Sequence, residues 1–197
     1  MDDDGGLVKR AKGGDLRAAE ELFSRHQSGA YTAALRLLGE KADAEDVTQD
    51  ALVKAYTRLS DLAEGASFGG WLRRIAVNLS LNALRRRGIL RFEPLEGLGG
   101  GGDEEAAPRE FIDDRQQTPE DEALNAALRD EVERLIRRLP SEQRVAVVLR
   151  DMYGYDVAEI AELQRCGLSA AKMRIKRGRA HLRRLLSEAP KPELVAV

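Results

Sequence analysis

The stretch "DVAEIAELQRCGLSAAKMRIKRGRAHLRRLL", residues 156–186, decides the fold of the C-terminal part of the chain. Asp156 can cap a helix, and Glu159 three residues later completes a capping-box-like pair. The short helix predicted at about 156–163 is followed by the tight connection "QRCG" and by a longer helix at about 168–186. A short helix, a turn that contains glycine and a longer basic helix together form the helix-turn-helix pattern.

In such a unit the second helix enters the major groove of DNA, and its N-terminal residues reach the base edges. We expect one face of the 168–186 helix to pack on the domain core and the opposite face to carry basic side chains. Lys172 lies near the helix start and is best placed to reach a base, whereas Arg174 and Arg177 are better placed for phosphates. Ser169 is predicted to cap the helix, which leaves backbone N–H groups free to meet a phosphate.

The composition of the 197-residue chain is rich in charge and poor in aromatic residues. Charged residues make up 34% of the chain and aromatic residues 5%, and the formal net charge is −2. The single cysteine, Cys166, excludes a disulfide within the chain and a zinc site built from thiolates. The start "MDDDGG" leads into no apolar run, and no apolar stretch is long enough to span a membrane. We therefore expect a soluble, cytoplasmic protein without membrane insertion.

Apolar residues recur at helical spacing through most of 7–90 and 121–186, and no strand pattern is found. Between these blocks, residues 93–122 include "GLGGGG", half of the six prolines and many acids. Such a segment buries too little apolar surface to offset its ordering entropy, so a flexible linker is favoured over a long loop inside one domain. The sequence predicts an all-α protein with two small helical domains. Its parts are a first domain at 1–92, the acidic linker at 93–122, a second domain at 123–187 and a disordered tail at 188–197.

Two basic helices are predicted within this slightly acidic chain. Residues 71–91 carry six arginines and no acid, and residues 172–184 carry seven basic residues and no acid. One such run is usually a solvated helix face, but two runs, each at the end of its domain, favour two contacts along one polyanion. The first run, "WLRRIAVNLSLNALRRR" at 71–87, also contains two amides, Asn78 and Asn82.

Five motifs follow one another in an order that is typical of one protein family. They are "KGGDLRAAEELFSRH", "DAEDVTQDALVKAYTRL", "FGGWLRRIAVNLSLNALRRR", "LPSEQRVAVVLRDMYGYDVAEIAEL" and "KMRIKRGRAHL". Together they resemble the extracytoplasmic-function (group IV) sigma factors of bacterial RNA polymerase, and the match covers nearly everything from Leu7 to Leu186. The resemblance implies two structured domains, region 2 and region 4. It also implies a transcription initiation factor that binds core RNA polymerase and directs it to specific promoters.

The resemblance implies that region 2 docks on the clamp helices of the polymerase β′ subunit. The helix that matches this role reads "AEDVTQDALVKAY". Its predicted contact positions are Asp46, Gln49, Asp50 and Val53. The residue types fit, because the helix presents acids beside an apolar stripe, although a solvated face without a partner stays open from the pattern alone.

The resemblance further implies that region 2 melts the promoter −10 element and captures a flipped base with the loop at about 60–70 and the helix at 71–87. Asn78 matches a position that lines this pocket, and Asn82 lies one turn later. An amide offers a donor and an acceptor to the edge of a flipped base, and arginines attract the strand whatever its sequence. Trp71 is predicted to pack in the core instead. The −10 candidates are Asn78, Asn82, Arg73, Arg74, Arg85, Arg86, Leu62 and Ala63.

Region 4 is implied to recognise −35 duplex DNA and to lie on the flap-tip helix of the β subunit. The −35 candidates are Ser169, Lys172, Met173, Arg174, Lys176, Arg177 and Arg179. The acidic linker would occupy the basic RNA exit path of the polymerase, and an anti-sigma factor is implied as a regulator that masks the polymerase-facing surfaces. Cys166, in the turn, is predicted to be a small apolar plug, with a redox switch as the alternative.

Two other function classes compete with this reading. A stand-alone helix-turn-helix regulator needs a dimerisation or ligand domain, and the first domain offers an acidic helix and a basic, amide-bearing helix instead. For an enzyme, the chain has no glycine-rich phosphate loop and no nucleophile elbow, and His26 and His181 lie in different domains with nothing to pair them with Cys166. We expect no catalytic residues, no metal, no cofactor and no small-molecule substrate.

Overall fold

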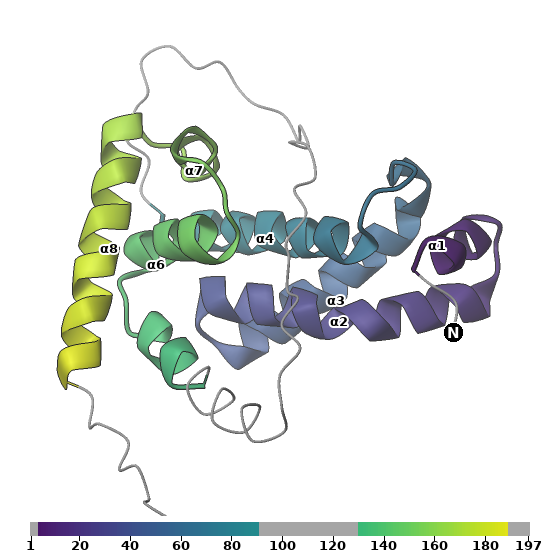
Figure 1. The fold of residues 1–197 in the computed structure, drawn as a ribbon, viewed down its shortest axis with the longest axis horizontal. Coiled ribbons are helices and arrows are strands. Elements are labelled where there is room, and N and C mark those ends of the chain that lie inside the picture. Colours follow the sequence, from purple (N-terminus) through teal and green to yellow (C-terminus); the bar gives the residue numbers. More distant parts are fainter. Residues whose placement is uncertain (1–3, 91–129, 189–197) are drawn as a thin grey trace, which may run out of the picture.

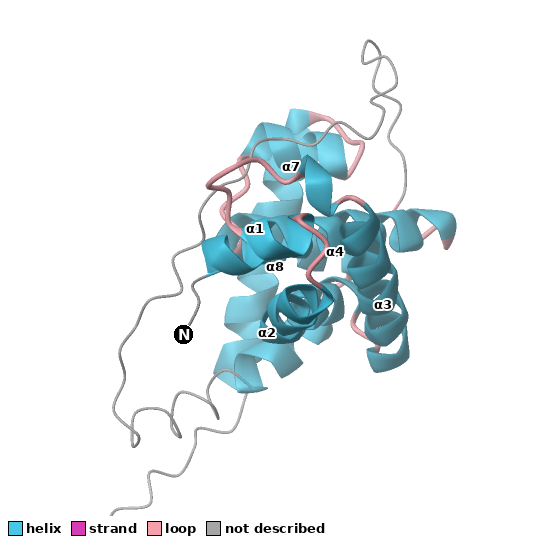
Figure 2. Ribbon diagram, turned by 90° about the vertical axis from the view of Figure 1, so that its right-hand side faces the viewer, coloured by secondary structure: helices cyan, strands magenta, loops and turns pink. Residues whose placement is uncertain are grey.

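The computed structural model describes residues 4–90 and 130–188, and every regular element in these two ranges is a helix (Figures 1 and 2). The all-α class is thereby confirmed for these residues, whereas the predicted linker at 93–122 lies outside them. The N-terminal range holds α1 (Asp4–Lys12), α2 (Leu16–Leu38), α3 (Lys41–Thr57), the short 3₁₀ helix η1 (Leu59–Asp61) and α4 (Phe68–Arg86). The C-terminal range holds a helix at 130–137, α6 (Ser141–Val147), the π-helical turn η2 (Val148–Met152), α7 (Val157–Leu163) and α8 (Leu168–Glu188).

Helix α2 lies at the centre of the N-terminal half, and local sequence determines both of its ends. The Asp15 carboxylate accepts hydrogen bonds from the backbone N–H groups of Arg17 and Ala18, which satisfies donors that a first helical turn leaves unpaired. At the other end Gly39 adopts the left-handed conformation, with φ 87°, and its N–H donates to the carbonyl of Leu35. Helices α1, α3 and α4 all pack on α2.

Aromatic residues at the start of α4 form the centre of this N-terminal core. The ring of Phe68 lies 5.1 Å from that of Phe23 and 6.0 Å from that of Trp71, measured between ring centroids. Trp71 is only 8% exposed, so the prediction that it belongs to the core is confirmed. Gly69 lets α4 approach α2 closely, because a Cβ at this position would lie 2.6 Å from Nδ1 of His26.

The C-terminal half contains the predicted helix-turn-helix. The Asp156 carboxylate accepts from the N–H of Glu159, and the Glu159 carboxylate accepts from the N–H of Asp156, so the capping box at the start of α7 is confirmed. After the turn at 164–167, α8 begins at Leu168. Ser169 is therefore the second residue of α8 and not the residue before it, and the prediction that Ser169 caps the helix is wrong.

Helix α8 packs on α6 through a glycine. A Cβ at Gly178 would lie 2.5 Å from Cγ2 of Val147 and 3.1 Å from the carbonyl oxygen of Gln143, so a larger residue requires α6 to move. Cys166 is buried in the core that α7 and α8 share, as an apolar plug requires. The opposite side of α8 faces solvent.

The two halves of the chain are in contact, which the sequence pattern does not indicate. One hydrophobic cluster combines Leu37 of α2 and Leu84 of α4 with Val145 and Leu149 of the C-terminal half. Figure 1 shows α6, α7 and α8 gathered at one end of α2 and α4, with α1 at the other end. The C-terminal half therefore covers part of α4, the helix with most of the −10 candidates.

Candidate nucleic-acid and polymerase interfaces

The first half of α8 presents a basic, exposed surface. Five of the −35 candidates lie exposed there: Ser169, Lys172, Met173, Lys176 and Arg177. Their spacing of three and four residues places them on adjoining parts of the solvent side of the helix. Three of the five are positively charged, and Met173 is a large exposed apolar residue that can meet a thymine methyl group. The surface therefore has the positive charge and the exposed side chains that a major-groove helix needs.

Arg174 is not part of this surface, contrary to the phosphate contact that the sequence suggests. Its side chain is 8% exposed, and Nη1 donates a hydrogen bond of 3.0 Å to Oε1 of Gln164. Its Nη2 lies 3.3 Å from a carboxylate oxygen of Glu142. Position 174 lies beside the buried Ile175, on the side of α8 that faces the core. Arg174 therefore ties α8 to the turn and to α6, and its guanidinium is withdrawn from solvent.

Arg179 is exposed but has a protein partner. Its Nε donates to Oδ2 of Asp151 at 3.0 Å, and this hydrogen bond raises the pKa of Arg179. The ion pair joins the middle of α8 to η2. A contact between Arg179 and DNA would therefore compete with this exposed ion pair.

The −10 candidates in the first half of α4 face the C-terminal half of the protein. The guanidinium carbon of Arg73 lies 6.0 Å from the centroid of the Tyr153 ring, within range of a cation–π contact. Burial raises the pKa of the Tyr155 hydroxyl, and the nearby charge of Arg74 acts in the opposite direction. Asn78, one turn after Arg74, is half-buried, and within 4–90 and 130–188 its amide makes no hydrogen bond. The amide is therefore available to a further partner.

The second amide differs from the first. Oδ1 of Asn82 accepts a hydrogen bond from Nη1 of Arg85, so this amide is already engaged on its own helix. Arg85 is half-buried, and burial lowers the pKa of its guanidinium, with a smaller effect in the same direction from the like charge of Arg165 in the helix-turn-helix turn. Arg86 is exposed. Of the two asparagines, Asn78 is thus the one that can offer both of its polar atoms.

The loop before α4 has one exposed and one buried candidate. Leu62 is 3% exposed and packs in the N-terminal core, so its side chain does not reach the surface, contrary to the sequence-based prediction of a DNA contact. Ala63 is exposed at a turn in which the N–H of Ala66 donates to its carbonyl. Nζ of Lys12 donates to the carbonyls of Ser60 and Leu62 and ties this loop to α1. No motif in the sequence indicates this contact, because its partners are backbone atoms about fifty residues away.

The predicted polymerase contacts lie together on α3. Asp46, Gln49, Asp50 and Val53 are all exposed, at spacings that place them on one side of the helix. Tyr56, which is not among the predicted contacts, is 55% exposed and lies one turn after Val53. Its ring packs edge-on against Phe23, with centroids 6.2 Å apart. The i, i+3 spacing from Val53 was the available signal, and the resulting surface is acidic at one end and apolar at the other.

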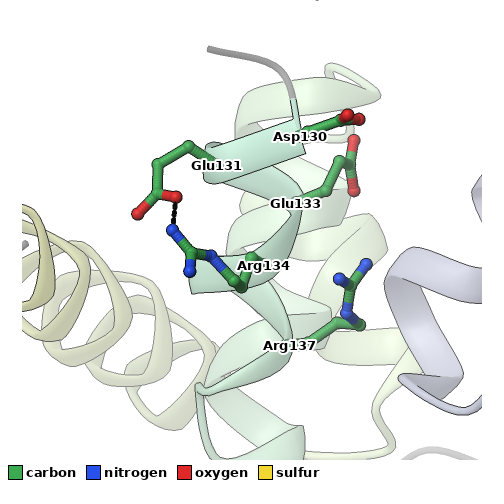
Figure 3. Close-up of a pocket in the computed structure, with 5 residues that line it drawn as sticks. All are labelled: Asp130, Glu131, Glu133, Arg134 and Arg137. Carbon is green, nitrogen blue, oxygen red and sulfur yellow. Dashed lines mark ion pairs between the residues drawn. The ribbon is translucent and has the colours of Figure 1, made fainter. Parts of the chain in front are cut away.

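A recess on the helix at 130–137 is lined by charges of both signs, from Asp130, Glu131, Glu133, Arg134 and Arg137. Figure 3 shows Glu131 and Arg134 joined by an ion pair on one side of the helix, and Glu133 and Arg137 on the other.

In the part of the chain that the structure describes, no group of three acidic, histidine or cysteine residues could hold a metal ion. None of the described helices is long and apolar enough to cross a membrane.

Comparison with family models gives two matches. The model for Sigma-70 region 2 matches residues 22–89, and the model for Sigma-70, region 4 matches residues 129–182. Each match covers most of one described half of the chain, and residues 4–21, residues 183–188 and the segment between the two matches lie outside both.

Proteins with similar sequences are also sigma factors. The ECF RNA polymerase sigma factor SigE of Mycolicibacterium smegmatis is 34% identical over 169 residues, which cover 86% of this chain and 62% of that protein. The ECF RNA polymerase sigma factor SigM of Mycobacterium tuberculosis is 33% identical over 183 residues, which cover 93% of this chain and 84% of that protein. Among solved structures, CnrH in complex with the cytosolic domain of CnrY is similar with a TM-score of 0.50 and 27% identity, over 96% of this chain and 100% of that chain. This chain spans less than two thirds of the first relative and more than four fifths of the second.

Proposed function

Because the chain belongs to the extracytoplasmic-function RNA polymerase sigma factors, we propose that it binds core RNA polymerase and directs it to specific promoters. One observation carries the proposal: a helix-turn-helix with an exposed basic surface on α8 and an acidic and apolar surface on α3 occur in the same chain. One molecule can therefore hold DNA and a second protein at the same time. Its task is to select and open DNA in the bacterial cytoplasm, and it needs no catalytic residue, metal or cofactor of its own.

In this proposal α8 enters the major groove of the −35 element. Lys172 lies in the second turn of α8 and reaches base edges, while Lys176 and Arg177 neutralise phosphates on the two sides of the groove. The burial of Arg174 supports this division of roles, because it leaves the exposed residues alone to contact DNA. Arg174 instead holds α8 at its angle to α7 through Gln164.

The −10 element is held by the polar side of α4 and the loop before it. Asn78 donates to and accepts from the edge of a flipped base, and Ala63 lies in the exposed part of the loop that meets it. Arg73, Arg74 and Arg86 supply positive charge along the single strand. The free amide of Asn78 supports this role, whereas the hydrogen bond between Asn82 and Arg85 supports a secondary, positioning role for Asn82.

Helix α3 is the surface for the polymerase. Its acids attract a basic partner, and Val53 together with Tyr56 supplies apolar area that a partner can bury. In the family, this partner is the pair of clamp helices of the β′ subunit, and the β flap-tip helix is the partner of region 4. The structure of CnrH bound to the cytosolic domain of CnrY is a precedent for a protein partner of a similar chain. For this chain we propose an anti-sigma factor in that place.

Run-off transcription over a promoter library with core polymerase tests the function. We expect transcripts only when the protein is present, and their start sites define one −35 and one −10 sequence. The rival reading, a stand-alone helix-turn-helix regulator, predicts tight binding of promoter duplex by the protein alone. Failure to co-purify with core polymerase, together with such binding, would support the rival.

The role of Asn78 has its own test. Asn78→Ala should leave binding to core polymerase and to duplex promoter unchanged but reduce permanganate reactivity of thymines in the −10 region. Asn82→Ala is the comparison variant, and it should reduce the reactivity less, because it removes an amide one turn away whose oxygen is already occupied. Equal reactivity of Asn78→Ala and wild type would exclude the assigned role.

A further inference from the structure

The contact between the two halves of the protein centres on one buried arginine. Arg144 of α6 is 6% exposed. Its Nε donates to the carbonyl of Leu37 at 3.1 Å, and its Nη2 donates to the carbonyl of Leu38 at 2.9 Å. These carbonyls end α2, where four acceptors have no partner inside the helix and where the helix dipole favours a positive charge. A residue of the C-terminal half thus caps the central helix of the N-terminal half.

The same guanidinium also serves its own domain. Nη1 of Arg144 donates to the carbonyl of Arg137 at 3.1 Å, at the end of the helix at 130–137. Gly39, which ends α2, makes room for this group, because a Cβ there would lie 2.8 Å from Nη1. Burial lowers the pKa of Arg144, with the charge of Glu40 acting in the opposite direction, and an arginine keeps its charge under such a shift. One buried cation therefore bridges two helix ends that belong to different domains.

A second polar contact lies beside the first. Nε of Arg36, in the last turn of α2, donates to a carboxylate oxygen of Glu133 at 2.5 Å, and Nη1 of Arg36 donates to the hydroxyl of Tyr153 at 3.4 Å. Tyr153 is buried, and the Arg73 guanidinium lies over its ring. The cluster of Arg36, Glu133 and Tyr153 therefore fixes α2 and α4 to the C-terminal half at a second point.

This contact covers the side of α4 that the −10 strand needs. Val77 and Leu81 share a hydrophobic cluster with residues of α6, η2 and α7. Helical spacing places Asn78 between Arg74 and Arg85, and these two arginines lie near Tyr155 and the turn residue Arg165. Asn78 itself is half-buried, so the C-terminal half lies along this side of α4 and narrows the access of a DNA strand to the unpaired amide.

We infer that the C-terminal half and single-stranded promoter DNA compete for the same side of α4, and that Arg144 is the latch of the closed state. The inference rests on the proposed function, since it concerns access to the −10 site. The interface also contains features that favour release. Nε of Arg85 is buried and has no hydrogen-bond partner within the described ranges, and the like charge of Arg165 lies nearby. DNA phosphates or an acidic partner can relieve both features, whereas the closed state cannot.

The test uses the 197-residue chain without polymerase. Two readouts are measured: the radius of gyration by small-angle X-ray scattering, and the affinity for a labelled single-stranded oligonucleotide that carries the −10 sequence found by run-off transcription. Arg144→Met removes the latch, and Arg36→Met weakens the second contact while leaving the caps made by Arg144 in place. Arg134→Met is the matched control, because it removes one positive charge from an exposed side chain whose ion pair stays within its own helix.

Arg144→Met and Arg36→Met should both increase the radius of gyration and tighten oligonucleotide binding. For Arg144→Met the affinity should rise by about tenfold, which corresponds to an open fraction of about one tenth in the wild type. The control should change neither quantity. If Arg144→Met loses helix content by circular dichroism, the result for Arg36→Met decides. The inference is overturned if the latch variants stay as compact as wild type, or if they expand without tighter binding.

This result is separable from the proposed function. A wild-type protein that supports run-off transcription, with latch variants that match it in size and affinity, would remove the latch and keep the sigma-factor role. A wild-type protein that supports no transcription would remove that role, whatever its compactness.

Discussion

Helices α4 and α8 are alike in sequence and different in their surroundings. Both are rich in arginine, both come near the end of their domain, and both approach a neighbouring helix closely at a glycine. The basic side of α8 lies in solvent, because α6 and α7 together cover only its apolar side. The basic side of α4 lies against Tyr153 and Tyr155, because α2 and α3 cover one side of the helix and the C-terminal half covers another.

The difference shows that positive charge on a helix indicates affinity for a polyanion but not access to it. For α8 the two coincide, so the helix can meet duplex DNA without rearrangement. For α4 access requires that the two halves separate. Within the proposed function, this would make duplex recognition the earlier step and strand capture the later one.

The largest expected effect on the free energy of unfolding comes from substitution of the glycines at which α8 and α4 approach their neighbouring helices. Gly178→Ala should destabilise the C-terminal half by about 2–3 kcal/mol, because its Cβ would meet Val147 and a backbone carbonyl that cannot move without shifting α6. Urea unfolding of the full chain, followed by circular dichroism, measures this change. Gly69→Ala should cost less, since its Cβ would meet the side chain of His26, which can rotate.

Gly29→Ala is the matched control for these two substitutions. Gly29 lies within α2, and a Cβ there would meet no atom within 4 Å. The substitution should stabilise the protein by up to about 1 kcal/mol through helix propensity. Equal effects of Gly178→Ala and Gly29→Ala would show that α8 and α6 are not in close contact.

Two arginines three positions apart on α8 should separate stability from DNA binding. Arg174→Met should lower the free energy of unfolding by about 1–3 kcal/mol, because it leaves Oε1 of the buried Gln164 without its donor. Arg177→Met should leave stability within about 0.5 kcal/mol of wild type. In promoter binding the order should be reversed. The slope of the logarithm of the binding constant against the logarithm of salt concentration should fall in magnitude by about 1 for Arg177→Met and stay unchanged for Arg174→Met. A reduced slope for Arg174→Met would return this residue to the DNA surface.

Lys172 tests whether α8 reads sequence. Lys172→Ala should reduce discrimination at one −35 base pair by about 1–2 kcal/mol while leaving the free energy of unfolding unchanged, because the side chain is exposed. Binding to a set of −35 variants measures the loss at each base pair. Uniform weakening over all variants would instead identify a phosphate contact.

The smallest effect concerns an arginine next to α4 that has a partner within its own half. A hydrogen bond from Arg87 lowers the pKa of Asp43, and the pair ties α4 to α3. The folded pKa lies below the unfolded value of about 3.9, so the pair contributes stability above that pH and loses it as the pH falls through the folded pKa. Asp43→Asn should therefore destabilise by less than about 1 kcal/mol at pH 7, and this difference should shrink as the pH falls below about 3.9, measured by thermal unfolding over that pH range.

Much of the fold could be predicted because its signals are local. The capping box of Asp156 and Glu159, the start of α8 and the burial of Trp71 follow from side chains that act on their own helix or on its apolar face. The exposed acids of α3 follow from helical spacing in the same way. The resemblance to the sigma factors predicts which of these helices contact DNA and which contact the polymerase, and the comparisons confirm that the chain belongs to this family.

Three sequence-based predictions are wrong, and two of them concern side chains that tertiary packing buries. Ser169 is predicted to cap α8, but the helix begins at Leu168, so the cap position is two residues earlier, at Gly167. Arg174 and Leu62 were expected at the DNA surface from their type or position, and the structure buries both. No prediction includes Lys12, because its contact with backbone carbonyls about fifty residues away leaves no pattern in the chain. The spacing of Tyr56 from Val53, in contrast, does place it on the same side of α3.

The sequence by itself determined the helices, the helix-turn-helix and the two basic segments, because helix caps, apolar period and charge act over a few residues. Only the tertiary structure decided which basic segment is open and which is covered. That outcome depends on Arg144, whose guanidinium meets carbonyls at the end of α2 more than a hundred residues away in the chain. Every residue has the same backbone carbonyl, so no pattern of side chains in the sequence could predict that Arg144 contacts the carbonyls at the end of α2.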